Sequence, residues 1–400
     1  MGMSLEEVAD RAGVEPSFVR RVVRSGVLEA EPDGTFSDGD VRRARVLEGL
    51  ERAGLPLETI AEAVGRGELQ FASLDRPVYD RFAELSASSF REVSERDEIP
   101  LEPLLVLREA MGFAQAGPDD RMREDELRVV PLIRLQLSKG FDPATIEPWL
   151  RVYGDALRRI AETEADWWHT QISVPKLAAG MTEAEVQEIS AEWGDEFDAL
   201  VDQALLAIYH AQQEHTWTEN LIEEIESALD RAGLRASMRT TPAICFLDIA
   251  GFTDLVEERG DQAATDVATR LMPLVTRLAE RHGGKVVKWL GDGVMLHFAR
   301  AEHAVAAALD MREAVADTDL PPAHIGIHSG PVVFQGGDYF GRTVNLAARI
   351  ADHAQPGQVL VSDDVARSVG SGRFAFAPIG PVGLKGVSGP VRLNAVARRS

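Results

Sequence analysis

The chain has 400 residues, of which 45% are hydrophobic and 27% are charged, so it can bury a core in each of two or three domains. Lys and Arg number 42 against 65 Asp and Glu, and the net charge of −23 disfavours binding to nucleic acid or to an anionic membrane. The single cysteine, Cys245, excludes an internal disulfide, and the acidic first residues do not look like a secretion signal. We therefore expect a cytoplasmic protein without a transmembrane segment.

Residues 4–67 read as four short amphipathic helices, each followed closely by a glycine. The stretch LEEVADRAGVEPSFVRRVVRSGVL resembles the helix-turn-helix of MerR-type regulators, and we assign residues 1–85 to such a module. Where that family has a basic, aromatic wing this chain reads EAEPDGTFS, and residues 1–67 hold nine Arg, no Lys and 13 acids. This charge favours a module that packs on protein over one that binds DNA.

The next segment contains a partial internal repeat. At an offset of 86, residues 14–60 partly realign with residues 100–146, mostly at apolar and glycine positions such as Gly54 and Gly140. The shared positions would form a core and its turns. We therefore predict a second helical module, within a helical regulatory region over residues 86–213.

Residues 147–215 keep a helical pattern and carry four of the six tryptophans. This concentration is consistent with plain core packing, a dimer surface or a lipid-sized pocket. Residues 216–235 then predict a short heptad-like helix in a linker over 214–236, suited to a parallel dimer contact or to docking on a domain. Its apolar stripe consists of Leu221, Ile225, Ala228 and Ala232.

The C-terminal part alternates strand and helix patterns in the order β-α-β-β-α-β, which is the ferredoxin-like plan. The Gly291-Asp292-Gly293 turn separates the two strands of a hairpin. The predicted elements are a strand over 244–249, a helix over 261–282, strands over 285–290 and 294–298, a helix over 301–315, a strand over 324–333 and a helix over 344–353. We thus predict an α+β chain, with an all-α N-terminal region and a ferredoxin-like domain over 237–400.

Four separated segments, FLDIAGFT, KWLGDGVMLHF, HIGIHSGPVV and DYFGRTVNLAARI, stand in the order and spacing of the class III nucleotidyl cyclase catalytic domain, which residues 242–400 resemble. The resemblance implies an adenylate cyclase that converts ATP to 3′,5′-cyclic AMP and pyrophosphate. A guanylate cyclase is one alternative, and a DNA-binding regulator with a degenerate cyclase-like sensor domain is another. The hairpin lacks the GG[DE]EF run of diguanylate cyclases, and the chain lacks a P-loop motif.

The resemblance implies a two-metal mechanism. Asp248 and Asp292, 44 residues apart, match the metal-binding aspartates, and the backbone carbonyl of Ile249 matches a further ligand. Hard carboxylate oxygens suit two Mg²⁺ or Mn²⁺ ions per active site, one to activate the ribose 3′-hydroxyl and one to bridge the phosphates.

The remaining site residues are assigned by the same motifs. Asn345 matches the residue that orients the ribose, and Arg349, one helical turn later, matches the residue that contacts the α-phosphate. Lys288 and Asp338 match the residues that bind adenine N1 and its exocyclic amine, so ATP should be preferred over GTP. Lys385 stands where the family has a lysine that binds the triphosphate.

In this family the two metal-binding aspartates come from one subunit, and the base-binding pair and the Asn-Arg pair come from the other. A chain that carries all six is expected to form a homodimer with two composite sites. The seven residues between Gly330 and Asp338 resemble the short-armed bacterial branch. The whole chain resembles soluble actinobacterial adenylyl cyclases regulated by acidity or lipid, so we expect residues 1–213 to respond to a proton, a lipid or another small molecule.

Overall fold

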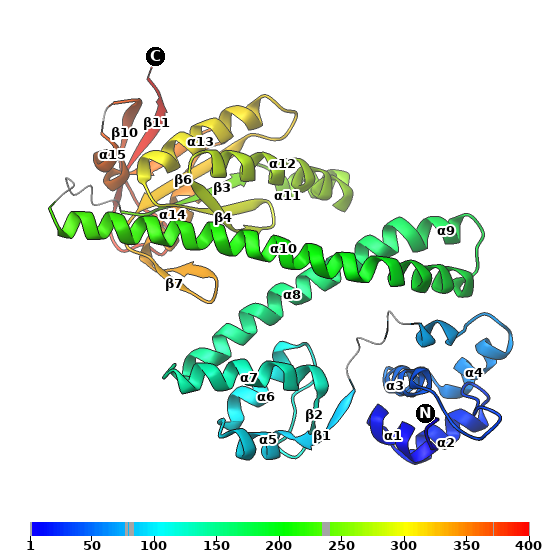
Figure 1. Ribbon diagram of the computed structural model, residues 1–400. Coiled ribbons are helices and arrows are strands. Elements are labelled where there is room, and N and C mark those ends of the chain that lie inside the picture. Colours follow the sequence, from blue (N-terminus) through cyan, green and yellow to red (C-terminus); the bar gives the residue numbers. More distant parts are fainter. Residues whose placement is uncertain (1, 77–78, 80–83, 234–240, 371, 400) are drawn as a thin grey trace. The chain divides into compact units, whose positions relative to one another are not determined.

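The computed structural model describes residues 2–76, 79, 84–233, 241–370 and 372–399. Its contacts divide the chain into two compact units, Met1–Glu226 and Ser227–Ser400. The first unit is helical except for one short two-stranded sheet, and the second combines a large sheet with helices, which confirms the predicted α+β class (Figure 1). The N-terminal region is therefore not all-α as predicted, because Leu85–Ser89 pairs with Arg121–Arg123. The domain limits given above stay predictions, and the limit between 236 and 237 lies outside the described residues.

The four helices predicted over residues 4–67 are confirmed. They are α1 (Leu5–Ala12), α2 (Pro16–Arg24), α3 (Asp38–Arg52) and α4 (Leu57–Gly65), followed by a 3₁₀ turn, η1 (Ala72–Asp75). At the start of α1 the Ser4 hydroxyl accepts from the Glu7 N–H, and the Glu7 carboxylate accepts from the Ser4 N–H at 2.7 Å. Helix α1 ends where Gly13 takes a φ of 73°, a conformation that favours glycine. The apolar faces of these helices form one core.

The second module repeats features of the first. Its elements are β1 (Leu85–Ser89), α5 (Phe90–Asp97), α6 (Leu101–Ala110), β2 (Arg121–Arg123) and α7 (Glu124–Ser138). Helix α7 begins and ends 86 residues after α3, as the offset in the sequence predicts. The third residue of each helix, Asp40 in α3 and Glu126 in α7, is a buried acid that accepts the backbone N–H of the residue before the helix. The positions shared by the two modules therefore include acids that cap helix N-termini as well as residues of the core.

Long helices follow the second module. They are η3 (Pro143–Thr145), α8 (Ile146–Trp168), the π-helical turn η4 (His169–Ser173), α9 (Val174–Ala178) and α10 (Glu183–Arg231). Trp168 joins α8 to α10, because its indole N–H donates to Ser190 Oγ at 3.1 Å and its ring meets Phe197 edge to face at 5.7 Å. Within the described parts of the chain, no helix combines the length and the apolar character needed to cross a membrane.

The prediction of a separate short helix over 216–235 is wrong. Helix α10 runs without a break for 49 residues through Arg231, because the segment contains no proline and only one glycine to interrupt it. Leu221 and Ile225, two members of the predicted apolar stripe, are 55% and 50% exposed on this helix.

The second unit is built on a seven-stranded sheet with the order β10-β11-β9-β6-β3-β5-β4. The strands are β3 (Ala243–Ile249), β4 (Gly284–Leu290), β5 (Gly293–Phe298), β6 (Ala323–Ser329), β9 (Val359–Ser362), β10 (Phe374–Val382) and β11 (Val391–Arg398). The helices are α11 (Phe252–Arg259), α12 (Asp261–Arg281), α13 (Ala301–Ala316), α14 (Arg342–His353) and α15 (Asp363–Val369). The antiparallel order β4-β5-β3-β6, connected through helices α12 and α13, confirms the ferredoxin-like plan.

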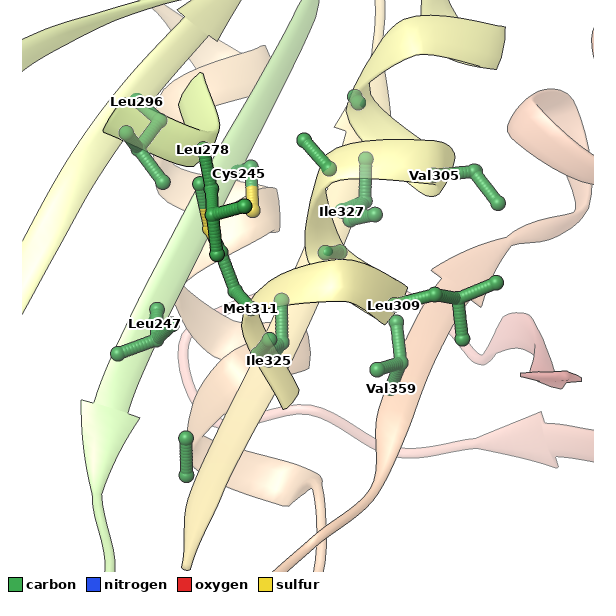
Figure 2. Packing of buried hydrophobic residues seen from close by; sticks show 14 of the residues in the cluster. Cys245, Leu247, Leu278, Leu296, Val305, Leu309, Met311, Ile325, Ile327 and Val359 are labelled. Carbon is green, nitrogen blue, oxygen red and sulfur yellow. The ribbon is translucent and has the colours of Figure 1, made fainter. Parts of the chain in front are cut away.

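The two faces of the sheet have separate cores. Side chains that alternate along β3, such as Cys245 and Leu247, pack against α12 and α13 on one face, where Leu278 and Met311 join them (Figure 2). On the opposite face β3 packs against α14. This second face carries the chemistry described below.

The strand predicted over 324–333 is too long. Strand β6 ends at Ser329, and residues Val333–Gln335 form a separate strand, β7, that pairs with β8 (Asp338–Phe340) in a short hairpin. Pro331 lies two residues after the end of β6, and because it lacks a backbone N–H it cannot continue the hydrogen-bond ladder of that strand.

A partly buried histidine predicts an acid-sensitive fold. His297 on β5 stacks on Tyr339, and burial together with the Lys285 charge lowers its pKa from 6.5 to about 4. As pH falls below 6.5, the unfolded chain binds a proton at this position that the folded chain does not, so stability falls until about pH 4.

We expect the free energy of unfolding of the second unit to fall about 2 kcal/mol less in His297→Phe than in the unmodified chain over this pH range. Phenylalanine can keep the stacking but cannot bind the proton. Denaturant unfolding at a series of pH values, followed by a probe in the second unit, measures the difference. Equal pH slopes in the two chains would contradict the prediction.

Candidate active site

The pairing of β3 determines the position of Asp248. Strand alternation directs Asp248, like Ile244 and Phe246, to the face covered by α14, one residue before the strand ends. Its two cross-strand neighbours are Gly293 on β5 and His324 on β6. The carboxylate therefore lies at the end of the central strand of the sheet.

Glycine at 293 leaves the space that this carboxylate occupies. A Cβ atom at Gly293 would lie 1.7 Å from Asp248 Oδ1 and 3.3 Å from the Leu247 carbonyl oxygen. Gly293 also closes the turn that carries Asp292, so the two aspartates predicted to bind metal lie at neighbouring strand ends.

The electrostatic surroundings of Asp248 fit a cation site. Burial raises the pKa of Asp248, His324 lowers it, and the carboxylates of Asp292 and Asp352 raise it again. Close carboxylates that are costly to ionise together become stable as anions when a cation lies between them. Ile249, the last residue of β3, is buried and follows Asp248 directly.

The donor set is small within this chain. The described residues include no group of three or more His, Cys, Asp or Glu side chains placed to hold a metal ion. Two aspartates and a backbone carbonyl can hold hard divalent cations only if a substrate or water supplies further oxygens, which is usual for Mg²⁺ bound with a nucleoside triphosphate. The residues thus fit the predicted Mg²⁺ or Mn²⁺ ions.

Lys288 and Asp338 are brought together. The Lys288 ammonium donates to Asp338 Oδ2, and Asp338 Oδ1 accepts the Tyr339 N–H at 2.8 Å. The two side chains are 40% and 23% exposed, so a ligand can reach both. The family resemblance implies a shared role for these two residues, and the structure shows a direct contact between them.

A β-bulge makes this contact possible. The register between β4 and β5 shifts between Val286 and Lys288, which adds Val287 to the β4 strand. Lys288 then pairs with Met295, which faces α14, while Trp289 packs against the opposite core. If β4 alternated regularly through Val287 without a bulge, Lys288 would lie on the same face as Val286, towards α12 and α13.

Asn345 and Arg349 are both exposed and lie one turn apart on α14. The helix can lie close to the sheet because small side chains face inward between them, including the fully buried Ala347. Arg349 Nη1 forms an ion pair with Asp352 Oδ2 at 2.6 Å, and the two side chains are about half exposed.

Lys385 lies apart from these residues. It is exposed in the connection between β10 and β11, at the edge of the sheet opposite to β4. Among the described residues, no contact joins it to the other site residues of its own chain, and its role stays a prediction.

Sequence reasoning missed three residues around the site. Gly293 was assigned to a turn, yet it also leaves room for Asp248. The motifs give no role to His324, which begins the segment HIGIHSGPVV, or to Asp352, which lies two residues after the segment DYFGRTVNLAARI. Alternation within HIGIH would have placed His324 on the face opposite to the apolar Ile325 and Ile327, which is the face of the site.

Comparisons with known proteins give matches to a family, to relatives and to solved structures. The family described as adenylate and guanylate cyclase catalytic domain matches residues 236–395. The chain is 30% identical to a pH-sensitive adenylate cyclase of Mycobacterium tuberculosis over 78% of this chain and 78% of that one. It is 28% identical to an uncharacterized protein of the same species over 87% and 89% of the two chains. Among solved structures, the adenylyl cyclase CyaB from P. aeruginosa is 26% identical, with 40% of this chain and 95% of that one covered and a TM-score of 0.37.

The space at Gly293 predicts a severe effect of one methyl group. In Gly293→Ala the Asp248 carboxylate must turn away, and we expect nucleotide cyclase activity to fall at least about 100-fold, the cost of misplacing a group at a reacting centre. The matched control is Gly383→Ala, which meets no heavy atom within 4 Å and should stay within about two-fold of the unmodified activity. Steady-state rates of both variants test this, and normal activity of Gly293→Ala would contradict it.

Proposed function

The chain belongs to the class III adenylate cyclases, and from this premise we propose that it converts ATP to 3′,5′-cyclic AMP and pyrophosphate as a homodimer. One observation carries the choice of ATP. Lys288 and Asp338 contact each other on the same face of the sheet that presents Asp248 and is covered by the helix of Arg349.

The base-binding pair is complementary to adenine. The Lys288 ammonium can donate to adenine N1, and the Asp338 carboxylate can accept from the exocyclic amine. Guanine carries a carbonyl oxygen in place of that amine, so the Asp338 carboxylate would face another acceptor. Leaving a partly buried carboxylate without a donor is costly, which favours adenine over guanine.

The reaction forms a bond between the ribose 3′-oxygen and the α-phosphorus and breaks the bond to the pyrophosphate oxygen. We assign to Asn345 the role of orienting the ribose, and to Arg349, one turn later on α14, that of donating to the α-phosphate oxygens as charge develops. Mg²⁺ or Mn²⁺ ions would be held by Asp248, Asp292 and the Ile249 carbonyl. They would lower the pKa of the ribose 3′-hydroxyl and neutralise negative charge on the phosphates. Lys385 is a further candidate for binding the triphosphate.

The composite arrangement is part of the proposal. Asn345 and Arg349 are exposed on α14, and Lys288 and Asp338 are accessible on the neighbouring strands. We assign the two aspartates of one subunit and these four residues of the partner subunit to the same active site. Two-fold symmetry then gives two such sites per dimer.

We also propose that the N-terminal helical region controls the activity. The support is the likeness along 78% of the chain to a relative whose name describes pH sensitivity, and that likeness extends beyond the residues matched by the catalytic family. The class of regulator proposed is a proton, a lipid or another small molecule.

The alternative of a DNA-binding regulator receives no support from the helix-turn-helix region. Arg20 and Arg21 on α2 form ion pairs with Glu6 and Glu51, which neutralise two cations that DNA phosphates would need. A guanylate cyclase remains the second candidate, and the assay below separates it from the proposal.

Product analysis tests the substrate. With Mn²⁺ and either ATP or GTP, the full chain should form cyclic AMP at least about ten-fold faster than cyclic GMP at limiting substrate. Asp338→Ala should reduce this preference because it removes the acceptor, while Asp292→Ala should abolish both products. Faster formation of cyclic GMP would overturn the choice of ATP.

Complementation tests the composite site. Asp248→Ala and Arg349→Ala chains should each be inactive alone, while a mixture that forms heterodimers should regain activity because one of its two sites is intact. Differently tagged chains and tandem purification isolate the heterodimer. An inactive heterodimer would contradict the shared site.

Truncation tests the regulation. We expect residues 214–400 and the full chain to differ in the pH dependence of ATP turnover between pH 5.5 and 8, because a control region changes the active population with conditions. Rates measured for both at equal dimer concentration give the comparison. Superimposable profiles would remove this part of the proposal.

A further inference from the structure

His324 connects the two parts of the active-site machinery within one chain. It lies on β6 directly opposite Asp248 on β3, so the two side chains share a face as cross-strand neighbours. On the same face its imidazole reaches the last turn of α14, where Nδ1 lies 2.9 Å from the Ala351 carbonyl oxygen. Because a carbonyl oxygen only accepts, the Nδ1–H of His324 is the donor.

The helix end that His324 binds carries the proposed transition-state arginine. Ala351 follows Arg349 by two residues and precedes Asp352, which pairs with Arg349 at 2.6 Å. The Ala351 carbonyl also accepts the Ala354 N–H at 3.0 Å, so the His324 donor adds a second hydrogen bond, which ties the final turn of the helix to β6. The position of this turn determines where the Arg349 backbone lies and therefore where its side chain starts.

The contact surface beneath this turn leaves little freedom. A Cβ atom at Gly326 on β6 would lie 2.1 Å from the Ala351 nitrogen and 2.7 Å from the Ile350 carbonyl carbon. Helix and strand backbones therefore meet without a side chain between them at Gly326, and His324 adds a hydrogen bond one pleat along the strand. Two neighbouring positions of β6 thus hold the end of α14.

We propose that His324 is a positioning residue for the cyclase reaction, which fixes the last turn of α14 and thereby aims Arg349 at the α-phosphate. This inference rests on the proposed function and goes beyond it. In the composite arrangement, Asp248 and Arg349 of one chain belong to different active sites. His324 therefore acts on the site that its own chain supplies with Arg349.

Two substitutions separate the hydrogen bond from other effects. His324→Leu removes the hydrogen-bond donor and puts an apolar side chain of similar size in its place. His324→Asn keeps an N–H donor near the position of Nδ1. In the full-length homodimer we expect His324→Leu to lower kcat at least about ten-fold with little change in KM for ATP, because misplacing a group that stabilises the transition state costs rate more than ground-state binding. His324→Asn should retain kcat within about three-fold.

The matched control is His328→Leu on the same strand. His328 faces the same side of the sheet, and its Nδ1 lies 2.7 Å from Ser362 Oγ, away from the residues of the site. Loss of this buried hydrogen bond should lower thermal stability without a selective fall in kcat. If both histidine variants change kcat and stability alike, His324 has only a structural role and the proposal fails.

Heterodimers give the sharpest test. In an Asp248→Ala and Arg349→Ala heterodimer, the intact site takes Arg349 from the Asp248→Ala chain and the aspartates from the other. His324→Leu placed in the Asp248→Ala chain should lower the restored activity about ten-fold, and in the Arg349→Ala chain it should change the activity less than about two-fold.

The outcomes are distinguishable. If the heterodimer without a His324 substitution is inactive, the composite site itself is wrong and the inference falls with it. If that heterodimer is active and His324→Leu acts equally from either chain, or more strongly from the chain that supplies the aspartates, the composite site stands and the positioning role is wrong. Failure of His324→Asn to retain kcat would also overturn the role of the hydrogen bond.

Discussion

The antiparallel pairing of β3 with both β5 and β6 is the constraint on which the active site depends. It places Asp248 between Gly293 and His324, so the carboxylate occupies the room that the glycine leaves on one side and has an imidazole as its neighbour on the other. The same register puts Gly326 under α14, where the absence of a side chain lets the helix lie directly on the strand. A slip of one residue in this register would turn Asp248 into the core formed with α12 and α13.

Much of this arrangement could be predicted because the determining signals are local. The Gly-Asp-Gly turn, the apolar alternation of β3 and the helical spacing of Asn345 and Arg349 each depend on a few neighbouring residues. The glycines that end the helices of the first module are signals of the same kind. These elements were found at or close to the predicted limits.

Features that depend on distant contacts could not be predicted in the same way. The bulge at Val287 follows from how β4 meets β5, and nothing in the letters KVVKWL marks an extra residue. The end of β6 depends on the hairpin that follows it. Helix α10 continues without a break through the polar segment where the sequence predicted the start of a separate helix. The ion pair of Arg349 with Asp352 depends on the conformations of the two side chains, which the sequence does not specify.

The ion pair between Lys288 and Asp338 has a consequence for selectivity. Two charges that already neutralise each other offer little gain in free energy to a free phosphate or a simple amine that binds only one of them. Under the proposed function, a base that binds here must separate the pair, and it recovers that cost only if it pairs with both side chains at once. A ligand that pairs with only one of the two charges leaves the other without a partner, so the closed ion pair disfavours ligands that match only half of it.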